Sequence, residues 1–271
     1  MTEVLSSTSN PKFKRLVALQ QKSSERRESA LFVVEGLREI GHCAASGYEP
    51  DHIFFCPQIV DEEKLPRCRH FALSPELYAK AAYREGTEGA IGVFKAREHG
   101  LDSLTLGANP LIAVLESVEK PGNLGAVLRS ADAAGADAVI VCDPLTDLFN
   151  PNLIRSSTGT IFSRQVVATT SEDAIKWLKD NSIKIYTAQL QDSSLYYDTD
   201  MKGGTAIVMG TEATGLSDIW RKAADAHIRI PMLGQADSLN VSVSAAILLF
   251  EAVRQRSRAE SKTVQRTFCS E

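Results

Sequence analysis

The chain has 271 residues, 44% of them hydrophobic, and a formal net charge of −4 at pH 7. Its uncharged apolar runs are shorter than the ~20 residues of a membrane-spanning helix, and its start lacks the basic and apolar regions of a signal peptide, so we expect a cytoplasmic protein that binds no membrane. The five cysteines and five histidines are scattered and form no C-x-x-C motif, which argues against a disulfide framework and a metal site.

The net charge conceals a basic stretch near the N-terminus. Residues 10–30 carry six cations against two acids, and the cations are Lys12, Lys14, Arg15, Lys22, Arg26 and Arg27. The last twenty residues are also basic. Basic ends on an acidic body can steer a nucleic acid to one face. Solvated terminal helices would explain the same charges.

Short predicted helices and strands alternate between residues 10 and 96. Residues 10–21 predict an amphipathic helix with Phe13, Leu16, Val17 and Leu19 inside. The following runs predict strands at 31–36, 52–55 and 90–96 and helices at 37–47 and 74–82, the latter capped by Ser74. We divide this part of the chain into a basic arm (1–29), an α/β domain (30–96) and a Gly- and Pro-containing linker (97–110).

A second alternating series occupies residues 111–271. Its strands are near-continuous apolar runs separated by helices, which predicts a parallel sheet covered on both faces. Ligands of such sheets bind beyond the carboxyl ends of the strands. Three loops that follow strands are therefore the candidate ligand-binding and catalytic regions.

The first loop, PGNLGAVLR, contains Asn123 and Arg129 and leads into a helix. The free N–H groups of that helix can hold an anion or a polar ligand. The loop lacks the G-x-G-x-x-G spacing, so a nicotinamide or flavin cofactor is disfavoured. Arg129 shares a face with Asp132, and a solvated ion pair with that residue is the structural alternative.

The second loop, GTEATGLS, holds one acid, Glu212, between Gly210 and Gly215. Two glycines permit close approach of the backbone and unusual dihedral angles. A plain connection from strand to helix, with Ser217 as N-cap, would fit the spacing equally well.

The third loop leads into SLNVSVSAAILLF, a segment without charge from Ser238 to Phe250. A helix with no charged face is buried on all sides. Ser238 suits an N-cap, but Asn240 and Ser242 are poor choices for a helix interior and need partners when buried. A polar ligand at this helix entrance would supply them.

Together the three loops resemble the SpoU, or TrmH-type, branch of the SPOUT RNA methyltransferases. The matching patterns are N-x-G-x-x-x-R at 123–129, G-x-E-x-x-G-L-S at 210–217, and I-P-M-x-G and S-L-N-V-S-V at 230–234 and 238–243. The resemblance implies an α/β methyltransferase domain with a parallel sheet and a deep trefoil knot. It also implies a smaller N-terminal substrate-binding domain similar to ribosomal RNA-binding proteins, and a homodimer packed through the terminal helix.

For this branch the resemblance implies methyl transfer from S-adenosylmethionine to a ribose 2′-hydroxyl, without a metal. The positions carried over for the cofactor are Gly210, Ile230, Met232 and Leu239. Those carried over for catalysis are Asn123, Arg129, Glu212, Ser238 and Asn240. Because arginine stays protonated, we interpret Arg129 as a clamp on phosphate and on developing alkoxide charge, contributed by the opposite protomer.

The expected substrate is a structured RNA, ribosomal RNA by family analogy, with its phosphates meeting Lys12, Lys14, Arg15, Arg26 and Arg27. A transfer RNA 2′-O-methyltransferase is one alternative. Another is an RNA-binding protein that has lost catalysis, since Ala213 and Thr214 depart from the Gly that many relatives have after the acid. A base methyltransferase of another SPOUT branch, methylation of a substrate other than RNA, and a nucleotide-dependent oxidoreductase are further alternatives.

Overall fold

The computed structural model describes residues 3–83, 88–97, 99–163, 165–211 and 214–268. The chain divides into two compact units, Met1–Glu98 with Asp147–Ser163, and His99–Thr146 with Arg164–Glu271. The predicted domains divide the chain differently, because the predicted arm (1–29) is part of the first unit and most of the predicted linker (97–110) is part of the second. Residues 147–163 lie in the middle of the second series of elements but pack with the first unit.

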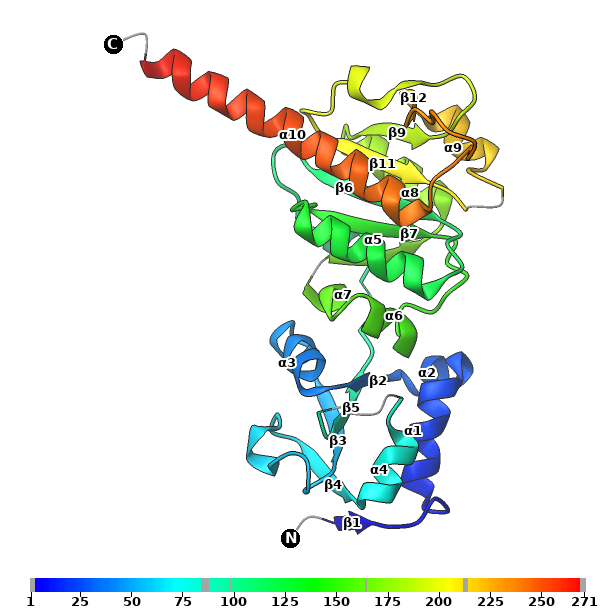
Figure 1. Ribbon diagram of the computed structural model, residues 1–271, viewed down its shortest axis with the longest axis vertical. Coiled ribbons are helices and arrows are strands. Elements are labelled where there is room, and N and C mark those ends of the chain that lie inside the picture. Colours follow the sequence, from blue (N-terminus) through cyan, green and yellow to red (C-terminus); the bar gives the residue numbers. More distant parts are fainter. Residues whose placement is uncertain (1–2, 84–87, 98, 164, 212–213, 269–271) are drawn as a thin grey trace. The chain divides into compact units, whose positions relative to one another are not determined.

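The first unit contains a five-stranded mixed sheet in the order β1-β4-β3-β5-β2 (Figure 1). Strand β5 is antiparallel to β2 and β3, whereas β4 is parallel to β3 and β1. The strands are β1 (Glu3–Leu5), β2 (Leu31–Glu35), β3 (Pro50–Phe55), β4 (Arg69–Leu73) and β5 (Ala90–Lys95). The helices are α1 (Pro11–Gln21), α2 (Ser23–Ser29), α3 (Leu37–Ala45), α4 (Pro75–Ala81), α6 (Pro151–Ser156) and α7 (Thr160–Ser163), with a 3-10 turn at Glu62–Lys64.

Helices α1 and α4 form as the sequence predicts. Asn10 accepts a hydrogen bond from the backbone N–H of Lys12 at 2.9 Å, and Ser74 caps α4 through the N–H of Leu77. The apolar stripe of α1 is buried in the core of this unit, at Phe13, Leu16 and Leu19. The predicted amphipathic helix is therefore confirmed.

The segment 147–163 completes the core on the side of β2 that carries Phe32. The ring of Phe149 stacks on Phe32 with centroids 4.4 Å apart, and Phe162 stacks on Phe32 at 5.9 Å. Nε of Arg26 lies 2.6 Å from Oδ2 of Asp147. Helices α6 and α7 contact β2 and α3, so this segment is an integral part of the first unit.

The second unit is built on a seven-stranded sheet in the order β10-β12-β9-β11-β6-β7-β8, in which every paired strand is parallel. Its strands are β6 (Leu111–Glu116), β7 (Ala138–Cys142), β8 (Gln165–Thr169), β9 (Lys184–Ala188), β10 (Ser194–Leu195), β11 (Thr205–Met209) and β12 (Ala226–Arg229). Its helices are α5 (Pro121–Ala133), α8 (Ser171–Asp180), α9 (Asp218–Ala223) and α10 (Val241–Phe268), with 3-10 turns at Leu101–Ser103 and Tyr196–Asp198. The predicted parallel sheet is confirmed.

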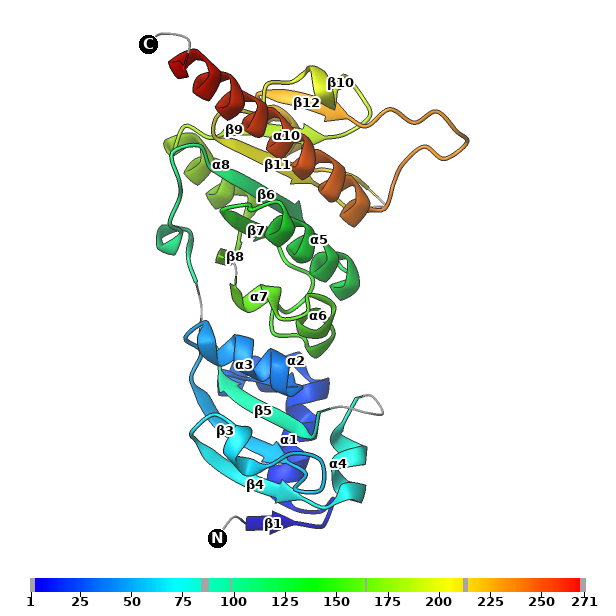
Figure 2. The same cartoon turned by 60° about the vertical axis from the view of Figure 1, so that its left-hand side comes forward.

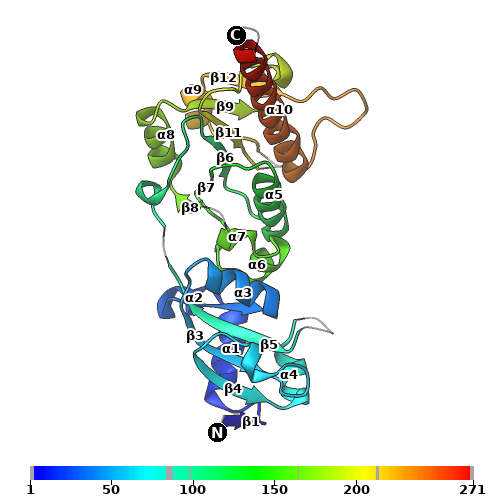
Figure 3. The same ribbon diagram turned by 90° about the vertical axis from the view of Figure 1, so that its left-hand side faces the viewer.

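Helices cover both faces of this sheet, as Figure 3 shows. Helices α5 and α10 lie side by side on one face, and α8 and α9 pack on the other. The strand residues facing α8 and α9 form one core with Leu178 and Trp220. The predicted trefoil knot concerns the path of the chain through this unit and stays a prediction.

Helix α10 follows the long segment after β12 (Figure 2) and begins at Val241, whereas a cap at Ser238 would have started it at Leu239. The cap is Asn240, whose Oδ1 accepts from the backbone N–H of Ser242 at 3.0 Å. Ser238 is therefore not the N-cap. The helix also buries only part of its surface within one chain, because Leu248 and Leu249 are buried while Val243 and Phe250 are each 46% exposed.

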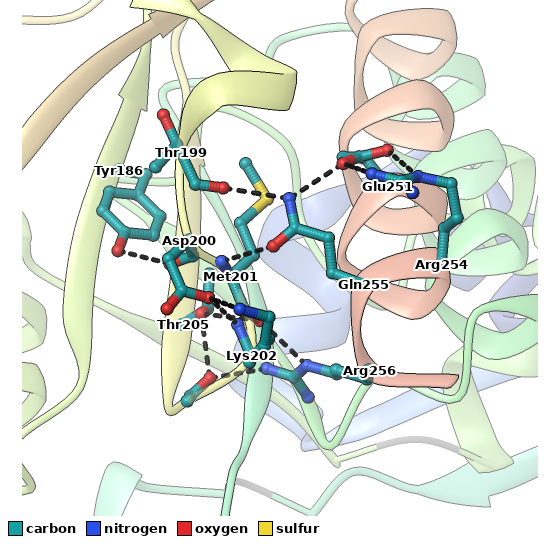
Figure 4. Close-up of polar contacts among 11 residues, drawn as sticks. Tyr186, Thr199, Asp200, Met201, Lys202, Thr205, Glu251, Arg254, Gln255 and Arg256 are labelled. Atoms are coloured by element: carbon teal, nitrogen blue, oxygen red, sulfur yellow. Dashed lines mark hydrogen bonds and ion pairs between the residues drawn. The ribbon is translucent and has the colours of Figure 1, made fainter. Parts of the chain in front are cut away.

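Polar contacts fasten the middle of α10 to the loop before β11 (Figure 4). Oε1 of Gln255 accepts from the N–H of Met201 at 2.9 Å. The Arg256 guanidinium donates to the backbone carbonyls of Met201 and Gly203, and also to those of Asn109 and Pro110. No described helix is both long and apolar enough to cross a membrane.

Candidate active site

A cavity of about 390 Å³ opens beyond the carboxyl ends of β9, β11 and β12, next to the start of α10. Its lining includes all four positions predicted to hold the cofactor, Gly210, Ile230, Met232 and Leu239, and one predicted catalytic residue, Ser238. These residues come from two loops separated by a helix and a strand. The parallel sheet brings them together because its strand ends share one edge.

The loop that follows β11 needs glycine at two positions. A Cβ atom at Gly210 would lie 2.2 Å from the carbonyl oxygen of Gly215, which no side chain could accommodate. Gly215 has φ +69°, the left-handed region that favours glycine. Backbone hydrogen bonds between Thr211 and Gly215, of 3.3 and 3.1 Å, close the loop. Glu212 and Ala213 lie outside the described residues.

A second cavity, of about 120 Å³, adjoins the first. Gly210, Thr211 and Val241 line both cavities, so the two share a wall. The rest of the lining comes from the loop after β6 and from α5, and consists of Val118, Glu119, Lys120 and Asn123. Nδ2 of Asn240 lies 3.2 Å from Oδ1 of Asn123. The structure thus brings the first and third predicted motifs into contact at Asn123, which lines the smaller cavity.

Arg129 is exposed on α5 and lines neither cavity. Within one chain Arg129 therefore lies outside the cavities that Asn123 and Ser238 line, and Asn240, which contacts Asn123, lines neither cavity itself. This placement agrees with the expectation that the opposite protomer contributes this arginine, an expectation that a single chain does not test.

A buried carboxylate that the sequence reasoning missed supports the second loop. Glu116, at the end of β6, is 6% exposed, and its Oε2 accepts from the N–H of Ser217 at 2.8 Å. Its other oxygen accepts from the hydroxyl of Ser217, so Ser217 occupies the N-cap position of α9 without a side-chain capping bond. Ser171 links this pair to Nε1 of Trp220. The signal was present in the sequence, as a charged residue closing the apolar run LIAVLE.

Burial excludes Cys142 as a nucleophile near this network. Desolvation raises the pKa of its thiol, and the nearby Asp143 and Glu116 raise it further. The thiol stays neutral at physiological pH. No group of three His, Cys, Asp or Glu side chains gathers as a metal site within the described ranges, and the expectation of a metal-free enzyme stays a prediction.

The basic residues of the first unit differ in their surroundings. Lys14, Arg15 and Arg27 are exposed, and Lys12 pairs with Glu3 while lying 4.4 Å from the centroid of the Phe71 ring. Arg26 has a different role from the one predicted. Its side chain is 4% exposed and is held by Asp147 and by the carbonyl oxygen of Leu19, so it has no surface to offer a phosphate.

Comparison with known proteins finds a matching family model in each half of the chain. Residues 110–250 match the model of the SpoU rRNA Methylase family, and residues 10–92 match the MRM3-like substrate binding domain. A 23S rRNA (uridine(2479)-2′-O)-methyltransferase of Streptomyces viridochromogenes is 28% identical over 268 residues, which cover 94% of this chain and 93% of the relative.

Two solved structures are similar over nearly the whole chain. An RNA 2′-O ribose methyltransferase has a TM-score of 0.81 and 37% identity, with 93% of this chain and 99% of the other covered. An AdoMet-bound rRNA methyltransferase from Sinorhizobium meliloti has a TM-score of 0.86 and 28% identity, with 93% and 98% covered.

Proposed function

Because the chain belongs to the SpoU rRNA methylase family, we propose that it transfers a methyl group from S-adenosylmethionine to a ribose 2′-hydroxyl of ribosomal RNA. The observation that carries the proposal is the pair of adjoining cavities whose shared wall is formed by Gly210, Thr211 and Val241. A methyl transfer needs a donor and an acceptor held in line at short range. Two cavities separated by one layer of residues meet that need.

The residues of the larger cavity fit S-adenosylmethionine. Its volume lies in the range of small-molecule sites, which are mostly apolar with a few placed polar groups. Leu216, Leu239 and Leu248 supply apolar surface for an adenine ring, and Gly210 allows the backbone to approach closely. When bound, S-adenosylmethionine supplies an electrophilic methyl group on a sulfonium that is a good leaving group.

The smaller cavity would receive the acceptor ribose. Its hydroxyl is a weak nucleophile, so the chain must orient it and ease the loss of its proton. Asn123, which lines this cavity, accepts a hydrogen bond from Asn240, and these two side chains would orient the hydroxyl. Ser238, in the wall of the larger cavity, would hydrogen-bond near the reacting centre. Glu212 would fix the loop geometry or the ribose.

Arg129 would act from a second copy of the chain, as a clamp on phosphate and on developing alkoxide charge. The exposed apolar side chains of α10, Val243 and Phe250, support a homodimer through this helix, next to the helix α5 that carries Arg129. Such a dimer would cover the face of α10 that one chain leaves open.

The first unit would hold the RNA. The match to a substrate binding domain over residues 10–92 supports this role, as do the exposed cations Lys14, Arg15 and Arg27. Lys12 remains among the proposed contacts, because its exchangeable surface ion pair with Glu3 adds little stability. Arg26 is left out. The cytoplasmic location stays a prediction.

The proposal is tested by incubating the purified protein with methyl-labelled S-adenosylmethionine and unmodified transcripts of 23S ribosomal RNA or of transfer RNAs. Label in ribosomal RNA alone supports the proposal. Label in transfer RNA alone would move the substrate to the first alternative. Tight RNA binding without any label, in a protein that also fails to bind the cofactor, would favour the non-catalytic RNA-binding protein.

A further inference from the structure

Two residues that line the larger cavity each carry a buried polar atom without a hydrogen-bond partner. The atoms are Oε1 of Gln189, which follows β9, and Nε of Arg221, which lies in α9. Of the buried side-chain nitrogen and oxygen atoms in the described part of the chain, these two alone are unpaired. Folded proteins rarely leave such atoms unsatisfied. Two of them on residues that line one cavity indicate a ligand that supplies the missing partners.

The chemistry of the two atoms is complementary. Nε–H of Arg221 is a donor on a permanent cation, which suits a carboxylate. The amide of Gln189 is oriented by Nε2, which donates to the carbonyl oxygen of Gln191 at 2.9 Å. This bond leaves Oε1 as an acceptor, which suits an ammonium or amine. Among the lining residues, Arg221 therefore offers an unpaired cationic donor and Gln189 an unpaired acceptor.

We infer that Arg221 binds the α-carboxylate and Gln189 the α-ammonium of the methionine part of S-adenosylmethionine. The inference rests on the proposed function, since it assigns two further residues to the cofactor of that function. The amino-acid head carries one anion and one cation on a single carbon atom, which matches the two unpaired atoms. Helix α9 contacts strand β9, so the two residues come from neighbouring elements.

A second arginine in the cavity wall is a weaker candidate for the carboxylate. Arg229 lines the cavity too, but its Nη1 is within 3.5 Å of the hydroxyl of Ser193. Arg221 is the cation whose buried nitrogen lacks a partner. The apolar side chains of Leu216, Leu239 and Leu248 remain for the adenine ring.

Calorimetric titration of the full chain with two ligands tests the inference. S-adenosylhomocysteine keeps the amino-acid head, whereas 5′-methylthioadenosine carries the same adenosine thioether without it. Arg221→Met should weaken S-adenosylhomocysteine about tenfold or more, as expected for loss of a charge-assisted hydrogen bond. The same variant should change the affinity for 5′-methylthioadenosine less than twofold. Gln189→Leu should show the same selectivity with a smaller loss.

Lys222→Met is the matched control, because Lys222 is exposed, lies next to Arg221 and does not line the cavity. It should leave both affinities unchanged. If Arg221→Met does not fold, Arg221→Lys and Gln189→Leu carry the test. Equal losses for both ligands, or no loss for either, would overturn the inference and leave the proposed function standing. A wild-type protein that binds neither ligand would instead contradict the cofactor of the proposed function.

Discussion

The side-chain amide of Asn240 joins the start of α10 to Asn123 of α5, which lines the proposed acceptor cavity. Its Nδ2 donates to Oδ1 of Asn123, 3.2 Å away on α5, while its own Oδ1 accepts from the N–H of Ser242 and caps α10. One residue of the third motif therefore caps α10 and also contacts the first motif. The polar entrance of an otherwise apolar helix is explained by both contacts.

Substitutions at Asn240 should separate these two contacts. Asn240→Asp keeps an acceptor for the cap but loses the donor to Asn123, so the melting temperature should stay near that of wild type. Methyl transfer should fall about 100-fold, the scale of a misplaced reacting group. Asn240→Ala loses the cap as well, and its free energy of unfolding should drop by about 1 kcal/mol. Full activity of the folded Asp variant would exclude Asn240 from the acceptor site.

Gly210 should tolerate no side chain. In Gly210→Ala the new Cβ would meet backbone atoms of Gly215 at 2.2 Å, so the loop must move and the wall shared by both cavities must change. Cofactor binding should fall below detection in calorimetry. Gly203→Ala is the control, since nothing lies within 4 Å of a Cβ there. Equal affinities for the two variants would show that the loop adapts without loss of the site.

Substitutions of the neighbouring residues Arg26 and Arg27 should affect different properties, the stability of the fold and the affinity for RNA. Arg26→Met leaves Asp147 without its ion-pair partner and the Leu19 carbonyl without its donor, so stability should fall by about 3–5 kcal/mol. Arg27→Met should keep the melting temperature and weaken RNA binding, and this loss should shrink as salt rises. Urea unfolding and RNA titration at two salt concentrations measure the two effects.

A double variant tests whether the loss of stability in Arg26→Met comes from the buried charge of Asp147. Arg26→Met with Asp147→Asn removes both charges and keeps an acceptor for the N–H of Phe149, which Asp147 now supplies. It should be more stable than Arg26→Met alone, because no buried charge is left unpaired. A double variant that is less stable than the single one would refute the ion pair as the source of the effect.

Arg256 should matter for stability where Lys202 does not. Arg256→Met removes hydrogen bonds to the backbone carbonyls of Asn109, Pro110, Met201 and Gly203, the last three of which still accept from Thr205, and should lower the free energy of unfolding by about 1–2 kcal/mol. Lys202 makes an exposed ion pair with Asp200, and Lys202→Met should leave the melting temperature nearly unchanged. Similar melting temperatures for both variants would contradict the anchoring role of Arg256.

Local rules predicted much of this molecule. The apolar stripe of α1, the Ser74 cap and the paired glycines of the second loop each depend on residues close in sequence, and all appear in the structure. The parallel sheet followed from apolar runs alternating with helices. Because such a sheet gathers its strand ends at one edge, the cofactor positions predicted from separate loops line one cavity.

Contacts between residues that are distant along the chain could not be predicted from the sequence. Arg26 and Arg27 look alike in sequence, and only the fold brings Asp147 to Arg26, 121 positions away. Residues 147–163 likewise gave no sign that they would pack with the first unit. Ser238 and Asn240 are both good N-caps, and tertiary packing rather than propensity selects Asn240. Gln189 and Arg221 stand out only because the fold leaves one buried atom of each unpaired.

The most direct test of the proposed activity is the chemical position of the methyl group. Ribosomal RNA treated with the protein and methyl-labelled S-adenosylmethionine is digested to nucleosides, and the labelled nucleoside is identified by mass spectrometry. We expect a 2′-O-methylated nucleoside, which loses an unmodified base on fragmentation, and about 100-fold slower formation of it with the Asn240→Asp variant. A methyl group on the base, or labelling by that variant at the wild-type rate, would contradict the proposed activity.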